Sequence, residues 1–158
     1  MRPMTPENLL PVFLLAPAAD AAGRTSTVYI DVTNARGRIQ LHVFVNQGNA
    51  ATVQIDPVQA TAAAGTGSKA LSANVDIWSN LDMAADEDFT QRTAAKTYTT
   101  DAGLKVKWVV FNIDPAAIDA ENGFKFLGVT TGASNAANIT SAFILVEPRY
   151  AAEVPLTY

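Results

Sequence analysis

Residues 39–45 alternate between large aliphatic side chains and other types, and this alternation constrains the fold more than any other feature of the chain. Every second position holds a large aliphatic residue: Ile39, Leu41, Val43 and Val45. Successive side chains of an extended strand point to opposite faces, so these four residues form one apolar face. On a helix they would be spread around the circumference. The pattern therefore predicts a half-buried β-strand, with Gln40 and His42 on its opposite face.

Strand-like runs of this kind recur along the chain and predict an all-β protein. Strand-like runs separated by polar, glycine-bearing segments lie at 26–33, 38–46, 51–56, 71–79, 97–100, 104–113, 124–130 and 140–147. Gln47, Gly48 and Asn49 predict a hairpin turn between the second and third runs. Alternation within 104–113 predicts that Trp108 faces the core. About eight short strands with such connections fit a β-sandwich, and among sandwiches a jelly roll is favoured.

One short helical turn is expected between the last strands. Asp114 is suited to cap it, Pro115 fits its first position, and Gly123 fits its exit. Asp119, which lies in the same segment, is also interpreted as a cap and not as half of a catalytic carboxylate pair.

The amino-terminal segment differs from the rest because large apolar residues alternate with prolines. We predict an extended arm over residues 1–22, followed by a single β-sandwich domain over 23–158. The arm is expected to dock on its own domain or on a neighbouring subunit, and removal of residues 1–17 is expected to leave the domain folded. The predicted intersubunit or capsid anchors are Leu9, Leu10, Phe13 and Leu14. Glu7 and the prolines disfavour a signal peptide.

Low charge indicates a surface that neighbours cover. Charged residues make up 16% of the chain, against about 25% in an average soluble protein. The net charge is −4 and Lys and Arg are not clustered, which argues against binding to nucleic acid. No run approaches the roughly 18 apolar residues that span a bilayer, so no membrane partner is expected. Assembly with other protein chains is favoured.

The sequence contains no convincing catalytic or metal-binding set. His42 is the single histidine and there is no cysteine; no nucleophile or orienting acid lies near His42 in the sequence. An acidic cluster at Asp82, Asp86, Glu87 and Asp88 has carboxylates of the kind that Ca²⁺ prefers, but its spacing does not match an EF-hand. We interpret it as a solvated loop. No enzymatic activity, cofactor or metal is predicted.

Three segments resemble head decoration proteins of tailed bacteriophages, which are also called cement or auxiliary capsid proteins. They are 28–36 (VYIDVTNAR), 43–46 (VFVN) and 143–150 (FILVEPRY). The resemblance implies a jelly-roll or related β fold, a homotrimer, and attachment to the outer surface of the capsid near its threefold positions. The implied partners are the major capsid protein and other copies of the chain. The expected function is structural, with the protein bridging adjacent capsid subunits.

Three other functions are weighed against this one. A tail or head-completion protein of the virion would have the same strand-like sequence pattern but would be present in few copies per particle. A carbohydrate-binding β-sandwich would use an exposed Trp78 or Tyr98. An enzyme would be limited to carboxylate chemistry, because the chain has one histidine and no cysteine.

Overall fold

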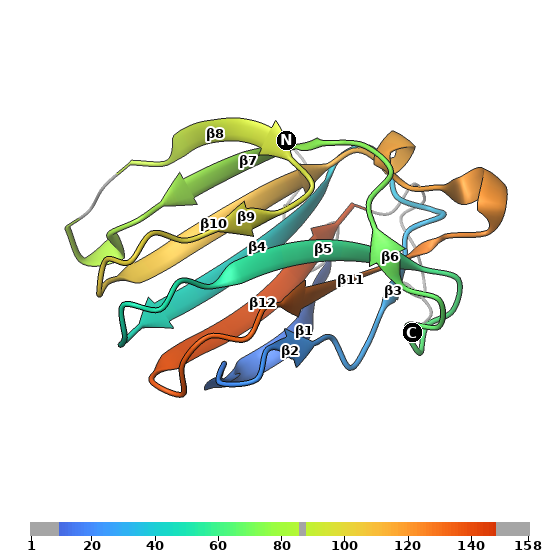
Figure 1. Ribbon diagram of the computed structural model, residues 1–158. Coiled ribbons are helices and arrows are strands. Elements are labelled where there is room, and N and C mark those ends of the chain that lie inside the picture. The colour runs from blue at the N-terminus through green and yellow to red at the C-terminus, as the bar shows by residue number, and fades with distance from the viewer. Residues whose placement is uncertain (1–9, 86–87, 148–158) are drawn as a thin grey trace.

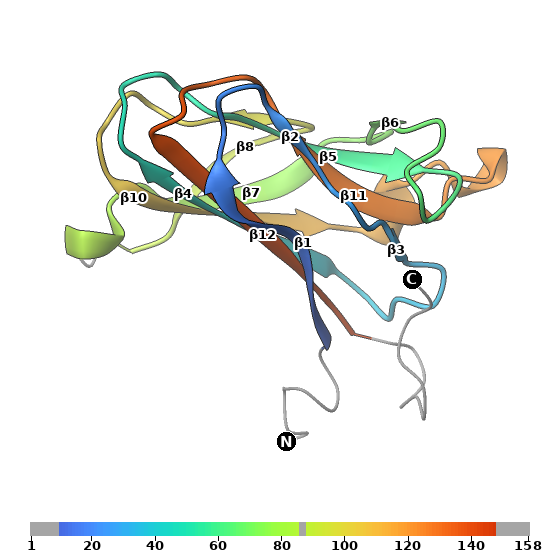
Figure 2. The ribbon, with the colours of Figure 1, turned by 90° about the horizontal axis from the view of Figure 1, so that it is seen from below.

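The chain folds into two antiparallel β-sheets packed face to face (Figure 1, Figure 2). This computed structural model describes residues 10–85 and 88–147, with only the backbone described at Leu10. The all-β prediction is confirmed: the helical elements among these residues are three-residue 3₁₀ turns. No helix in the described part of the chain is long and apolar enough to cross a membrane.

We name each sheet by a central strand. The β4 sheet has the order β1-β12-β4-β10-β7-β8, with bounds Leu10–Ala19, Asn138–Val146, Ile39–Gln47, Val106–Ile113, Val75–Asn80 and Thr90–Ala95. The β5 sheet has the order β2-β11-β5-β6, with bounds Arg24–Thr25, Phe126–Thr131, Gln54–Ala60 and Lys69–Ala70. Two further short strands complete it: β3 (Ile30–Asp31) beside β11, and β9 (Tyr98–Thr99) beside β5.

The strand order is that of a jelly roll. The chain changes sheet at nearly every step: β1 is followed by β2 in the other sheet, β3 by β4, β4 by β5, β10 by β11, and β11 by β12. Each sheet therefore has four main positions, with β2 and β3 sharing one and β6 and β9 sharing another. The β7–β8 hairpin, inserted between β6 and β9, extends the β4 sheet past β10.

The predicted hairpin at residues 47–49 is wrong. β4 pairs with β10 and β12, whereas β5 pairs with β11, β6 and β9. The turn therefore carries the chain from one sheet to the other. Turn residues reverse the chain in either case, and the local sequence does not reveal which strand becomes the partner.

The predicted arm is wrong for residues 10–19, which form strand β1 at the edge of the β4 sheet. β1 pairs with β12 from Leu10↔Val146 to Ala19↔Ile139. Prolines fit this strand because only one of its sides needs backbone hydrogen bonds. The boundary of the sandwich domain therefore lies before β1 and not at residue 23. Residues 1–9 lie outside the described residues.

The core fills the space between the sheets. The predicted apolar face of β4 is confirmed, since all four of its aliphatic residues are fully buried. A smaller cluster around Tyr29 covers the outer side of the β5 sheet. A Cβ atom on Gly65 or Gly128 would lie 2.5 or 2.6 Å from the Tyr29 ring, so these glycines allow the ring to lie flat there.

The connection between β10 and β11 forms one end of the sandwich. As predicted, Asp114 caps a turn that begins at Pro115: its side chain accepts from the Ala116 amide in the 3₁₀ turn η2 (Pro115–Ala117). Gly123, at φ 82°, ends η3 (Ala120–Asn122). The expected cap at Asp119 is not made. Its carboxylate lies 2.6 Å from Lys69 Nζ instead, because the turn faces the neighbouring β6 strand.

Candidate functional site

The register of the β4 sheet aligns aromatic residues in a row on its outer side. Phe13 pairs with Phe143, Phe143 with His42, His42 with Val110, and Val110 with Trp78. A neighbouring row places Trp108 opposite Phe44. Because paired residues point to the same face, side chains from five strands meet on one surface.

We call this surface the aromatic face and define it by Phe13, His42, Phe44, Trp78, Phe89, Trp108 and Phe143. Six of its rings form a chain of contacts across the sheet: Phe13, His42, Phe44, Phe89, Trp108 and Phe143. Phe44 stacks on Trp108 with centroids 5.0 Å apart, and the Phe89 ring meets Trp108 edge-on at 4.9 Å. At the other side Phe13 lies 6.0 Å from Phe143. Such offset and edge-on pairs are the favourable arrangements for aromatic rings.

The position of Trp108 corrects the sequence prediction. Trp108 lies half-buried on the outer face, and the core-facing residues of β10 are Lys107, Val109, Phe111 and Ile113. Lys107 is fully buried, because its ammonium group donates to Gln47 Oε1 and to the backbone and carboxylate oxygens of Asp101 at 2.6–2.8 Å. A charged residue, Lys107, thus occupies a core position. The alternation was assigned with Trp108 inward, so the prediction placed the tryptophan on the wrong face of the strand.

His42 faces outward, as predicted, but neighbouring rings bury it. It stacks on Phe143 with centroids 4.7 Å apart and planes 4° from parallel. Its Nδ1 accepts from the Trp108 indole N–H at 3.1 Å, while its buried Nε2 has no hydrogen-bond partner among the described residues. Burial lowers the pKa of His42 to about 4. The ring is therefore neutral at pH 7, with its proton on Nε2.

A shallow hollow of about 320 Å³ opens on the aromatic face. Aromatic rings and amide groups line it: Gln40, His42, Trp78, Phe89, Trp108, Val110 and Asn112. The amides of Gln40 and Asn112 hydrogen-bond to each other at 3.2 Å. The hollow therefore offers flat apolar walls, with uncharged polar groups at one side.

The four predicted anchor residues have different environments. Phe13 is 67% exposed at the edge of the aromatic face. Leu14 is 2% exposed in the core of its own chain, so its assignment as an anchor for another chain is wrong. A register shift between Phe13 and Leu15 turns both Leu14 and Leu15 inward. Leu9 and the side chain of Leu10 lie outside the described residues.

The remaining candidates from the sequence do not converge on a site. Asp82 pairs with Lys105, whose ammonium group lowers the pKa of that carboxyl; Asp86 and Glu87 lie outside the described residues. Tyr98 is half-buried against the core, with its hydroxyl 3.4 Å from Ser79 Oγ. Trp78, by contrast, lines the hollow. Among the described residues no three His, Asp or Glu side chains gather as metal ligands would.

Sequence reasoning missed the aromatic face as a unit. The individual residues are spread over positions 13 to 143 of the sequence, and only the strand order brings them together. The signal that was present is the type of residue on the outer side of β4: His42 and Phe44 alternate with the buried stripe, where a solvated face would carry charged residues.

Comparison with known proteins places the chain in no family. No protein-family model matches it, and neither does any curated protein. Among solved structures, the crystal structure of the SPBc2 prophage-derived protein YomS is similar, with 11% sequence identity and a TM-score of 0.48. The similarity covers 93% of this chain and all of that one. At this level the neighbour establishes no function for the chain.

Proposed function

We propose that this chain is a non-enzymatic structural protein of a phage virion, a decoration protein that binds the outer surface of the capsid as a homotrimer and bridges capsid subunits. The observation that carries the proposal is the aromatic face. A two-layer sandwich standing alone exposes the outer sides of both sheets to water, and large apolar patches on such surfaces mark interaction sites.

The size of the face favours a protein partner. Six strands spaced about 4.8 Å apart, each 20–30 Å long, give the outer side of the β4 sheet, on which the aromatic face lies, an area on the order of 600 Å². Each partner in a standard protein interface contributes about 800 Å². Aromatic residues are also enriched at the energetically important centres of such interfaces. The major capsid protein is the partner that the resemblance of segments 28–36, 43–46 and 143–150 implies.

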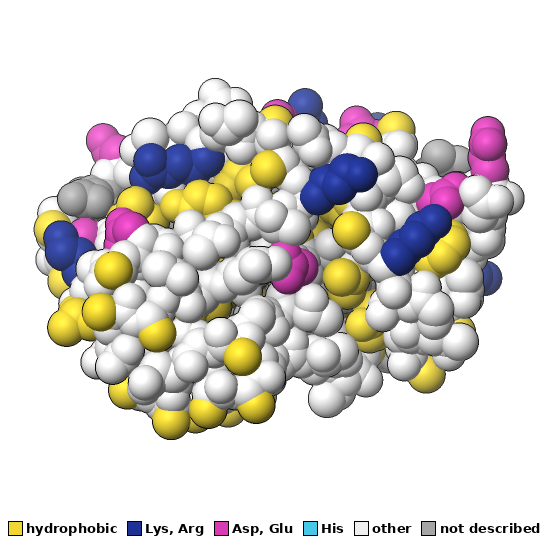
Figure 3. Space-filling view, in the orientation of Figure 1, with side chains coloured by type: hydrophobic (Ala, Val, Ile, Leu, Met, Phe, Trp, Pro, Cys, Tyr) yellow, Lys and Arg dark blue, Asp and Glu magenta, His cyan; other side chains and the backbone are white. Residues whose placement is uncertain are grey.

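The distribution of charged side chains favours docking through the aromatic face over docking through the outer side of the β5 sheet. Figure 3 shows the side of the β5 sheet, where Lys and Arg side chains stand apart from one another, with hydrophobic side chains and acidic groups beside them. On the β4 sheet, Arg38 and Asp76 form an ion pair at 2.6 Å, with Asp76 paired to Asn112 beside the hollow. The rings of the face itself are uncharged at pH 7.

The state of His42 supports the non-enzymatic part of the proposal. A general base needs a substrate proton or a nucleophile within hydrogen-bond reach. The one hydrogen bond that His42 makes to the described residues is with the Trp108 indole, and its lowered pKa makes it a weak base.

The first experiment is quantitative mass spectrometry of purified particles from the source. About one copy per major capsid subunit is the expected result for a decoration protein. A ratio of a few per cent would instead assign the chain to the tail or to head completion. Absence from particles would overturn the virion assignment altogether.

Binding of purified variants to undecorated particles tests the face itself. Phe13→Ser and Phe89→Ser remove rings that are 67% and 37% exposed, so folding should survive. Fully burying a phenylalanine side chain in an interface contributes about 1.5–3 kcal/mol, and we therefore expect at least tenfold weaker binding for each variant. Leu104→Ser is the matched control, because Leu104 is 63% exposed in the β9–β10 connection. Unchanged binding by both phenylalanine variants would contradict docking through this face.

A carbohydrate-binding module is the second candidate, and the hollow is the observation that favours it. Trp78, Phe89 and Trp108 supply aromatic surfaces on which the C–H groups of a sugar ring can stack, and the amides of Gln40 and Asn112 can bond hydroxyls. A glycan array tests this function. Binding that Trp78→Ala abolishes would support it; no signal on the array would remove it.

A further inference from the structure

The core contains a lysine, Lys107, whose side chain is completely buried near the start of β10. Its ammonium group contacts two other side chains, Gln47 Oε1 at 2.8 Å and Asp101 Oδ1 at 2.6 Å. Lys107 pairs with Val45, and Gln47 lies two residues further along β4, so the amine and the amide come from neighbouring strands on one face of the sheet. A nucleophile, a carboxamide and a carboxylate therefore meet at one buried nitrogen.

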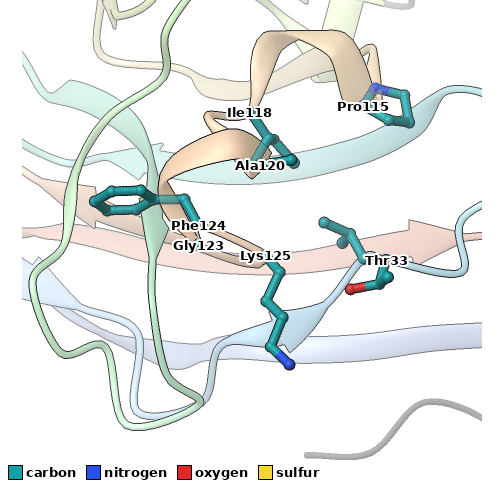
Figure 4. Close-up of a pocket in the computed structure, with 8 residues that line it drawn as sticks. Thr33, Pro115, Ile118, Ala120, Gly123, Phe124 and Lys125 are labelled. Atoms are coloured by element: carbon teal, nitrogen blue, oxygen red, sulfur yellow. The ribbon is translucent and has the colours of Figure 1, made fainter.

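A lysine in a solvated environment lies at the other end of the sandwich, beside a second hollow (Figure 4). This hollow measures about 290 Å³, and Ile118 and Phe124 form part of its wall. The Lys125 side chain at the same site is 53% exposed, and its ammonium group stands 3.9 Å from the carboxylate of Asp31. Water can solvate that ammonium group, whereas the buried Lys107 depends on the protein for all of its hydrogen bonds.

The side-chain amide of Gln47 is held in one orientation. Its Oε1 accepts from the Thr100 hydroxyl at 2.9 Å, and its Nε2 donates to the backbone oxygens of Ala51 and Asp101 at 3.2 and 2.8 Å. With Lys107 as the second donor to Oε1, each polar atom of the amide has two partners. A hydroxyl that donates to a carbonyl oxygen stabilises the negative charge that develops there when a nucleophile attacks the carbon. The amide is therefore both immobilised and polarised.

The distance from Lys107 Nζ to the amide carbon suits nucleophilic attack. A C=O bond is about 1.23 Å long, so a nitrogen 2.8 Å from Oε1 lies no more than about 4 Å from Gln47 Cδ. Atoms poised to react are about 3–3.5 Å apart, and holding them there is equivalent to an effective concentration of about 10⁵–10⁸ M. A shift of about 0.5 Å by the flexible lysine side chain brings Nζ into this range.

The carboxylate of Asp101 lies on the solvent side of this group. An amine attacks only after it has lost its extra proton, and a carboxylate 2.6 Å from Nζ is within reach to accept that proton directly. The hydrogen bond from Lys107 lowers the pKa of Asp101, so this carboxyl group is ionised at pH 7. Its side chain is 54% exposed, so a small product released beside it can reach solvent.

We propose that Lys107 and Gln47 join in an intrachain isopeptide bond once the chain has folded. Asp101 accepts one proton from the Lys107 ammonium group, Nζ attacks Gln47 Cδ, and the Thr100 hydroxyl stabilises the oxyanion. The bond from Cδ to Nε2 then breaks as Asp101 returns its proton to Nε2. The ammonia that leaves takes the second proton from Nζ and departs as ammonium.

One Nζ–Cδ bond forms and one Cδ–Nε2 bond breaks, so the reaction needs no oxidant, reductant or added reagent. The cross-link joins β4 to β10 in the middle of the β4 sheet. This inference is independent of the proposed capsid function.

The mass of the full, denatured chain tests the proposal. Loss of one ammonia makes the cross-linked chain about 17 Da lighter than its sequence requires. Trypsin should then release residues 39–69 and 106–125 as one branched peptide, because a modified Lys107 is not cleaved. A chain of unmodified mass would overturn the proposal. A loss of about 18 Da, with Asp101 in the branched peptide, would overturn the assignment to Gln47, because attack on a carboxyl group releases water.

Asp101→Asn separates the chemistry from the packing. Asparagine can still accept from Lys107 but is not a base, and the exposed position should allow folding. A general base contributes about 10²–10⁴-fold to a rate, so the lighter species should appear at least tenfold more slowly in this variant. Asp88→Asn is the matched control, because Asp88 is an exposed carboxylate just before β8, and it should cross-link at the wild-type rate. Equal rates in the two variants would overturn the role assigned to Asp101.

Discussion

At the scale of single residues, His42 links the aromatic face to the stability of the fold. Its ring is held between Phe143 and Trp108, and burial lowers its pKa to about 4. In the unfolded chain the same group titrates near 6.5. The unfolded state therefore binds a proton between pH 6.5 and 4 that the folded state does not, and the free energy of unfolding must fall as the pH falls through this range.

We predict that His42→Gln removes this pH dependence. Glutamine does not titrate, and its amide oxygen can accept from Trp108. Between pH 6.5 and 4 the wild-type free energy of unfolding should fall by about 1–3 kcal/mol more than that of the variant. Urea unfolding at several pH values measures both curves. Asp20, whose pKa burial raises, stabilises in the opposite direction as the pH falls, but it is present in both proteins. Parallel curves would contradict the prediction.

Lys107 shows where residue-level prediction from sequence ends. The alternation in 104–113 is real, but its phase depends on whether Lys107 or Trp108 is taken to be buried. Hydrophobicity favours Trp108, whereas the fold buries Lys107 because Gln47 and Asp101 provide acceptors for its three protons. Gln47 lies 60 residues away, so no local pattern shows that these acceptors exist.

At the scale of elements, β1 determines how the sandwich begins. It covers the edge of β12, and its residues Val12, Leu14 and Leu15 are each at most 7% exposed. Burying three such side chains contributes up to about 5–9 kcal/mol. That is a large part of the 5–15 kcal/mol by which a typical domain is stable. The segment is therefore part of the domain and not a separable arm.

Deletion of residues 1–17 is consequently predicted to unfold or severely destabilise the protein. Deletion of residues 1–9 is the matched control, because it removes none of β1. Circular dichroism during thermal unfolding compares the two truncated proteins with the full chain. A cooperative transition within a few degrees of the full chain after removal of residues 1–17 would show that β1 is dispensable and that the arm interpretation was sound.

Strands with a strong apolar stripe could be located from sequence, while exposed strands could not. The run predicted at 38–46 corresponds to β4 (Ile39–Gln47), and that at 104–113 contains β10 (Val106–Ile113). β8 (Thr90–Ala95) was missed because none of its residues is buried, so it carries no alternation. The sequence did not reveal which strands pair with one another, because pairing in a jelly roll joins segments far apart in the sequence. The wrong hairpin prediction at residues 47–49 has the same cause.

At the scale of the whole molecule, the apolar side chains on the outer surfaces of the two sheets are covered to different extents. The chain covers the apolar cluster on its β5 side with Tyr29, whose ring lies against Gly65 and Gly128. On the β4 side no further layer of described strands or turns lies over the aromatic face (Figure 2). Among the described residues, one outer apolar cluster is covered and the other is left exposed, which is the arrangement expected if a partner binds the aromatic face as proposed.

If the chain binds particles as proposed, the same contrast predicts how that binding depends on salt. The chain carries a net charge of −4, but the rings of the aromatic face are uncharged at pH 7. Raising the ionic strength from 0.1 to 1 M shortens the Debye length from about 10 Å to 3 Å and screens exposed charges, yet it does not weaken apolar contacts. We therefore expect the number of copies bound per particle to change by less than twofold over this range, as measured by co-sedimentation. Release of most copies at 1 M salt would show that ion pairs hold the protein on the particle, and would move the docking surface from the aromatic face to the charged side chains of the β5 side.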